Sequence, residues 1–231
     1  MVDFKLIKIR KKRKLYQIIY NHLNYIADLN DYSLLNNYLN DLKSYLNGYT
    51  PKNKLFKILR KVHLKEPYLN LIYLLKFCEN ILNYLKYPEI KRFIDLIVYA
   101  KETSKLGFLL LITASNETLN QINIDHISII DVFSYILLNY DSLLSQRKIH
   151  FANQDIIDFN LTIKDNRYIV NNNLYMIWNR LAHKVRESMS NYKKAITFFD
   201  DCQNLLINSY LKDITSKLNK YSFDTFTKLT E

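Results

Sequence analysis

Residues 34–51 read LLNNYLNDLKSYLNGYTP, and their pattern indicates a helical fold. Its apolar side chains recur every three or four positions, as they do on one face of an α-helix. They are Leu34, Leu35, Tyr38, Leu39, Leu42, Tyr45 and Leu46. Gly48 and Pro51 then predict a sharp end, because glycine accepts the left-handed conformation that is common after a helix.

The same helical period extends over most of the chain. It predicts helices over residues 15–26, 52–87 with a break at Pro67, 88–110, 127–144, 174–189 and 193–218. The composition agrees, because only two of the 231 residues are glycine and three are proline, whereas an average protein carries about 7% glycine. Glycine-rich nucleotide loops and barrels with many tight turns are therefore excluded.

Residues 147–170 predict short strands in place of helices. Phe159, Leu161 and Ile163 alternate with polar residues, which is typical of a half-buried strand. Residues 165–167 predict a turn, residues 168–170 a return strand and residues 147–151 a third strand. The predicted fold is mainly α: a long antiparallel helical hairpin followed by a small truncated α/β unit with two or three strands.

This reading predicts four regions. They are a basic N-terminal arm at residues 1–14, a helical segment at 15–50, a helical hairpin at 51–122, and a truncated α/β region with a C-terminal helix at 123–231. The net charge is +11, and the arm concentrates it, with seven basic residues against one acidic residue. Such a block suits phosphate backbones or anionic lipid, and it also suits a solvated arm.

Cysteine and histidine usage points away from metal and disulfide chemistry. Cys78 and Cys202 lie far apart, and the five histidines show no metal-ligand spacing. We therefore expect no metal, no cofactor and a reducing compartment, either cytoplasm or organellar stroma. The longest uncharged apolar run, near residues 106–114, is shorter than the ~20 residues of a membrane span, so we expect a soluble protein.

The order of these elements resembles a bacterial-type sensor histidine kinase. Residues 63–72, His-Leu-Lys-Glu-Pro-Tyr-Leu-Asn-Leu-Ile, are similar to the family's phosphoacceptor box. Residues 179–184, Asn-Arg-Leu-Ala-His-Lys, are similar to its ATP-site asparagine box. The resemblance implies a dimeric phosphotransfer hairpin before an ATPase-like domain, with His63 and Glu66 as catalytic residues and Asn179 and His183 in the nucleotide site.

The sequence departs from the family at three places. His63 stands four residues before Pro67 instead of five, which turns it by ~100° around a helix. His183 replaces the asparagine that helps hold Mg-ATP, although Mg²⁺ prefers oxygen ligands. No glycine follows Gly107, so the family's glycine segments are missing. ATP-dependent autokinase activity is therefore not expected.

Together these features predict a degenerate histidine-kinase-like protein in two-component-type signalling. It would act as a phosphotransfer or regulatory homodimer with a response-regulator-type partner. Two alternatives stay open: a nucleic-acid-associated protein that binds through its basic arm, and a plain helical interaction module in which His63 is an ordinary surface histidine. The arm's candidate phosphate contacts are Lys8, Arg10, Lys11, Lys12, Arg13 and Lys14.

Overall fold

The structure is a computed structural model. It describes residues 18–19, 22–23, 25–26, 29, 31–49, 52–66, 68–86, 90–114, 121–139, 152–161, 163–164, 167–168, 172–195, 211–212 and 214–216. The basic arm at residues 1–14 and the predicted strand at 147–151 lie outside these residues. The chain divides into two compact units. Unit 1 takes its described residues from 8–88 and 101–124, and unit 2 from 89–100 and 125–231.

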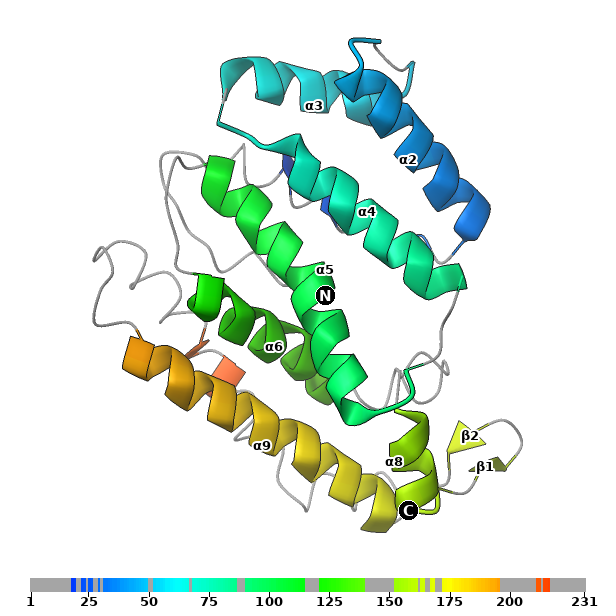
Figure 1. Ribbon diagram of the computed structural model, residues 1–231, viewed down its shortest axis with the longest axis vertical. Helices are drawn as coiled ribbons and strands as arrows, with labels where there is room; N and C mark the ends of the chain where they lie inside the picture. Colours follow the sequence, from blue (N-terminus) through cyan, green and yellow to red (C-terminus); the bar gives the residue numbers. More distant parts are fainter. Residues whose placement is uncertain are drawn as a thin grey trace. The chain divides into compact units, whose positions relative to one another are not determined.

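Unit 1 is built from α2 (Tyr32–Leu46), α3 (Lys54–Lys65), α4 (Leu71–Lys86) and the second part of α5 (Phe93–Ala114) (Figure 1). The starts of α2 and α3 are capped by side chains. Asp31 accepts a hydrogen bond from the Leu34 N–H at 2.9 Å, and Asn53 accepts one from the Leu55 N–H at 2.9 Å. Gly48 follows α2 with φ +92°, a left-handed conformation that favours glycine.

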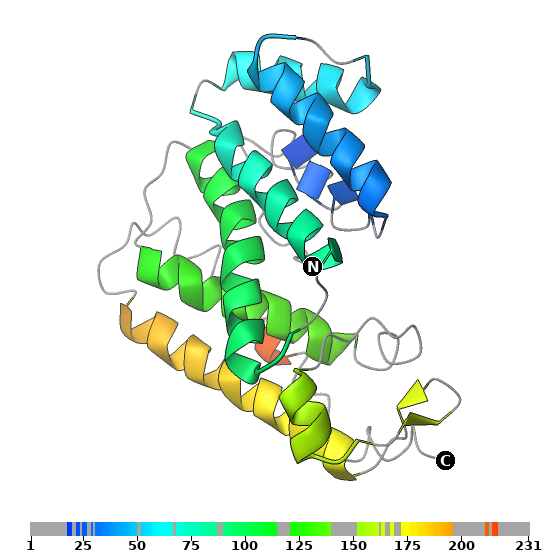
Figure 2. The ribbon, with the colours of Figure 1, turned by 45° about the vertical axis from the view of Figure 1, so that its right-hand side comes forward.

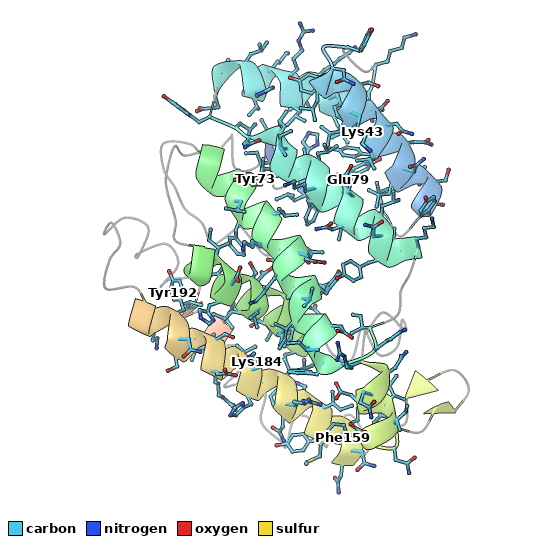
Figure 3. All side chains as sticks on the ribbon, viewed as in Figure 1. Lys43, Tyr73, Glu79, Phe159, Lys184 and Tyr192 are labelled. Atoms are coloured by element: carbon cyan, nitrogen blue, oxygen red, sulfur yellow. The ribbon has the colours of Figure 1, made fainter. Side chains whose placement is uncertain are left out.

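The core of unit 1 forms where α2 packs on α4. Leu35 and Leu42 of α2 and Leu74 of α4 are fully buried. Lys43 and Glu79 bridge the same two helices at 3.1 Å, and Figure 3 shows both side chains. Because both are about half exposed, this ion pair adds only a fraction of a kcal/mol, and apolar burial holds the helices together.

The contact between α4 and the second part of α5 is polar at its edge. The Asn80 side chain donates to the Glu102 carbonyl at 2.8 Å, and the Tyr84 hydroxyl donates to the Glu102 carboxylate at 3.1 Å. In unit 1, α4 therefore contacts both α2 and the second part of α5, and α3 connects α2 to α4 along the chain.

Unit 2 contains the first part of α5, most of α6 (Gln121–Leu138), α8 (Asn153–Asp158) and α9 (Asn172–Ala195). Figures 1 and 2 both show α6 lying alongside α9. The segment before α5 pairs with the start of α8, because the Asn153 and Gln154 N–H groups donate to the carbonyls of Ile90 and Lys91 at 2.7 and 2.9 Å.

The predicted α/β unit is wrong. Between α8 and α9 the described residues contain only β1 (Ile163–Lys164) and β2 (Arg167–Tyr168), an antiparallel pair of two residues each. Such a pair cannot form a sheet that buries a core. Phe159 caps the end of α8 and Asn160 has φ +46°, so of the three alternating residues only Ile163 lies in a strand. The fold is helical in both units.

The predicted fold, with a long antiparallel hairpin over residues 51–122, is also wrong. The break at Pro67 is confirmed, since α3 ends at Lys65 and α4 begins at Leu71. However, α4 packs on α2, which precedes the predicted hairpin. Helical periodicity shows which face of each helix is buried, but it does not show which helix covers that face. The predicted domain boundaries stay predictions.

Candidate functional site

A set of buried polar side chains lies in the apolar interior of unit 2. On α6 it includes Ser128, Asp131 and Ser134, which are at most 2% exposed, and on α9 it includes Ser188, which is 1% exposed. Their helical neighbours are buried and apolar, among them Ile124, Ile127, Ile130, Phe133, Leu181 and Val185. We call these four residues the buried polar set.

Two hydroxyls of the buried polar set lack a hydrogen-bond partner. Neither Ser134 Oγ nor Ser188 Oγ has one among the described residues, although both atoms are inaccessible to solvent. A buried hydroxyl without a partner costs roughly 1–3 kcal/mol. A ligand with a polar end could accept hydrogen bonds from these groups, and its apolar part would suit the side chains around them.

An ion pair connects helices of unit 2. Arg180 of α9 pairs with Asp155 of α8, whose side chain is only 3% exposed. The Arg180 guanidinium also lies 4.2 Å from the centre of the Phe93 ring of α5, and Phe93 meets Phe133 of α6 edge-on at 5.8 Å. One arginine therefore connects α8, α9, α5 and, through Phe93, α6.

The charge of Asp155 depends on Arg180. Burial raises the pKa of the Asp155 carboxyl above its usual range, and the positive charge of Arg180 acts against that rise. A buried carboxylate with a partly exposed arginine is typical of a structural ion pair. We assign Arg180 and Asp155 to holding unit 2 together.

Unit 1 has its own buried polar group, His22. The ring is 1% exposed, and its Nδ1 lies 2.9 Å from the Tyr38 hydroxyl. Burial lowers the pKa of His22 to about 4, while the backbone of Leu55 acts in the opposite direction, so the imidazole is neutral at pH 7. Phe56 packs edge-on against the ring at 6.3 Å. His22 is thus part of the core.

The residues assigned from the kinase resemblance lie in separate places. His63 is half buried in the last turn of α3, with its Nδ1 3.1 Å from the Tyr45 hydroxyl of α2. Glu66 ends the same helix. Asn179 and His183 lie on α9, the first half buried and the second exposed. The structure brings His63 near Tyr45, and it places His63 and Glu66 at the end of α3 but Asn179 and His183 on α9.

Lys184 and Glu187, next to His183, form an exposed pair on α9. The lysine donates to the carboxylate at 2.9 Å, and this hydrogen bond lowers the pKa of Glu187, helped by the charges of Lys184, His183 and His126. Such a pair on a helix surface contributes a few tenths of a kcal/mol. This pair forms part of the solvated face of α9.

Metal binding has no candidate centre in the described part of the chain. No group of three or more histidine, cysteine, aspartate or glutamate side chains there is arranged to hold an ion. No helix among the described residues is long and apolar enough to cross a membrane.

The sequence reasoning missed the buried polar set, although a signal was present. Ser128, Asp131 and Ser134 are spaced by three inside an otherwise apolar stretch at residues 127–138. A carboxylate at such a position has to be buried with the helix, which marks it for attention. The Asp155–Arg180 pair, separated by 25 residues, had no comparable signal.

Comparison with known proteins gives a fold and no close relative. No protein-family model matches the chain, and no curated protein matches it by sequence. A solved structure described as the crystal structure of a dehydrosqualene synthase in complex with ligand is similar, with a TM-score of 0.74. The match covers 94% of this chain and 78% of that chain at 13% sequence identity. At this identity the likeness shows the fold.

This finding overturns the histidine-kinase interpretation. The structural neighbour has the all-helical isoprenoid-synthase fold, which has no place for a kinase-type ATPase domain. The local matches at residues 63–72 and 179–184 therefore do not indicate a kinase fold. Two-component signalling is not supported, and neither is the nucleic-acid alternative.

Proposed function

We propose that this protein binds an isoprenoid ligand in unit 2, as an isoprenoid-synthase-like protein. The observation that carries the proposal is the fold similarity to a dehydrosqualene synthase over 94% of the chain. Since one fold hosts many functions, the site must supply the chemistry. The buried polar set supplies hydroxyls and a carboxylate inside an apolar helical layer, which suits a ligand with a long apolar chain and one polar end.

The hydroxyls of Ser134 and Ser188 have the clearest part in this proposal. Each is a donor without a partner among the described residues, so a ligand oxygen that accepts a hydrogen bond would relieve the cost of burying it. Asp131 would orient a donor group or a cation that accompanies the ligand. The surrounding isoleucine, leucine and phenylalanine side chains would exclude water from the apolar chain.

Thermal unfolding of the full chain with farnesyl diphosphate, with and without Mg²⁺, tests the proposal. Binding at 100 times the dissociation constant stabilises the folded state by about 2.7 kcal/mol, a rise of several degrees in Tm. Incubation followed by mass spectrometry of extracted lipid then shows whether the ligand is converted into a hydrocarbon. An unchanged Tm at saturating ligand, with the alcohol farnesol equally inactive, would rule out the proposal.

Two matched substitutions locate the site. Ser134→Ala and Ser188→Ala remove buried hydroxyls that have no partner among the described residues, so the free protein should become more stable, by up to about 1–3 kcal/mol for each, while ligand binding weakens about tenfold in the two together. Ser44→Ala on the exposed side of α2 is the control and should change neither quantity. Equal affinity in all variants would place the ligand elsewhere.

Two further expectations from the sequence stand here as proposals: the protein is a homodimer, and it works in a reducing compartment. Cys78 supports the second, since it is a free, buried cysteine and burial raises the pKa of its thiol well above the usual range. Light scattering of the purified protein tests the first, and a monomer at all concentrations would reject it.

A further inference from the structure

The exposed side of α3 combines lysines with large apolar side chains. Lys57, Lys61 and Lys65 are exposed, and so are Ile58 and Leu64 of the same helix, at 37% and 74%. On a helix of 3.6 residues per turn these five positions fall within an arc of about 120°. Tyr68, in the turn after α3, is 58% exposed. We call these six residues the α3 face.

The opposite side of α3 explains why this face is left outside. Phe56, Leu59 and Val62 are buried against the rest of unit 1 and use up the helix's inward side. Figures 1 and 2 show α3 at the edge of its unit, next to α2 and the start of α4. The α3 face is therefore a surface feature of a firmly packed helix.

The charge of the α3 face is uncompensated. Helix α3 contains no acidic residue. Lys57, Lys61 and Lys65 have no ion pair among the described residues, whereas Lys43, Arg92, Arg180 and Lys184 are paired. Single exposed apolar residues are common on protein surfaces, but the α3 face gathers three of them with three lysines that have no ion pair among the described residues, and such a combined surface is a candidate interaction site.

We propose that the α3 face docks on the surface of an anionic lipid bilayer. The lysines would meet the negative headgroups, and Leu64, Ile58 and Tyr68 would enter the boundary between headgroups and acyl chains. Around the helix the three lysines lie between Leu64 and Ile58. Their long apolar stems let the charged ends reach the headgroups while the apolar side chains at the two edges of the face enter the boundary. A polyanion such as RNA would use the same lysines, but it gives no reason for an exposed Leu64 among them.

Co-sedimentation of the full chain with vesicles tests the proposal. One set of vesicles is phosphatidylcholine, and the other contains about one third phosphatidylserine, as in anionic leaflets. We expect binding to the anionic set that weakens as salt rises from about 0.1 to about 0.5 M. Equal binding to both sets, or none to either, would overturn the proposal.

Charge variants with a matched control connect the binding to α3. Each lysine near an anionic surface contributes about fivefold to the partition coefficient, so the triple variant Lys57→Gln, Lys61→Gln, Lys65→Gln should bind on the order of 100-fold more weakly. The control triple Lys91→Gln, Arg186→Gln, Lys193→Gln removes the same charge from exposed positions of unit 2. Equal losses in the two triples would reject the α3 face as the docking surface.

An apolar variant separates a bilayer from a polyanion. Leu64→Ser with Tyr68→Ser should weaken vesicle binding about tenfold or more, because insertion of both side chains is lost. Both residues are mostly exposed, so circular dichroism should show an unchanged fold. Unchanged vesicle binding in this variant, together with RNA binding that the lysine triple abolishes, would identify a polyanion surface and overturn the proposal.

Discussion

Replacing Arg180 by leucine should leave a buried charge without its partner. The Asp155 side chain is 3% exposed and pairs with Arg180, whose own side chain is 43% exposed. Removing one partner of a buried ion pair costs about 3–5 kcal/mol. Because water reaches part of the arginine, we expect the lower end, about 3 kcal/mol at pH 7, which includes the lost contact with the Phe93 ring.

The cost should depend on pH in a defined direction. Burial raises the pKa of Asp155 in the folded state, and Arg180 opposes the rise, so the Arg180→Leu variant should have a still higher pKa at this carboxyl. A raised carboxyl pKa means that the folded state holds the proton more tightly than the unfolded chain. The destabilisation caused by Arg180→Leu is therefore fully present where the pH is above the pKa of Asp155 in the folded variant, and it disappears as the pH falls toward about 4.

Urea unfolding at pH 7 and at about pH 4 measures this difference. At pH 7 the expected loss corresponds to a Tm lower by about 6–12 °C for a chain of this size. The double variant Asp155→Asn, Arg180→Leu is the control, and it should be more stable than Arg180→Leu alone because no charge is left buried. A loss at pH 7 below about 1 kcal/mol, or an equal loss at both pH values, would contradict a buried carboxylate that depends on Arg180.

Two further changes test unit 1. As pH falls from 6.5 to about 4, His22 takes up a proton in the unfolded chain before it does in the folded protein, so the free energy of unfolding should fall by up to about 3 kcal/mol. Chemical unfolding across this range should show a weaker pH dependence for His22→Gln than for the unchanged protein. The same pH dependence in both would contradict a buried neutral imidazole. Phe56→Ala removes a fully buried ring that lies 5.0 Å from Tyr38, and it should cost about 3–5 kcal/mol by calorimetry, whereas Tyr49→Ala, at 73% exposure, should change stability by less than about 0.5 kcal/mol.

Local signals predicted individual helices well. The apolar period and the Gly48 stop place a helix end at Leu46, where α2 ends. Pro67 separates α3 from α4 as expected. The helix predicted to begin at Pro88 begins at Phe93 instead, where the Arg92 N–H donates to the Asp95 carboxylate at 2.9 Å. These features depend on hydrogen bonds and steric preferences within a few residues, which the sequence states directly.

Local signals failed where two readings of one pattern compete. Phe159, Leu161 and Ile163 alternate like a strand, but Phe159 is the residue that caps the end of α8. Three alternating positions do not separate a strand from a turn that points its apolar residues inward. The kinase-like box at residues 63–72 failed for a related reason, because it spans the end of α3 and the break before α4 rather than one continuous helix.

From the sequence alone it follows that most of the chain is helical and that helices end near Leu46 and before Pro67, because the helical period and the residues at helix ends act over a few positions. Only the tertiary structure decided which of these faces meet. It set α2 on α4, His22 beside Tyr38, and Asp155 against Arg180 across 25 residues. The physical reason is that an apolar face lowers its free energy against any well-fitting apolar partner, so the choice among partners depends on the packing of the whole unit.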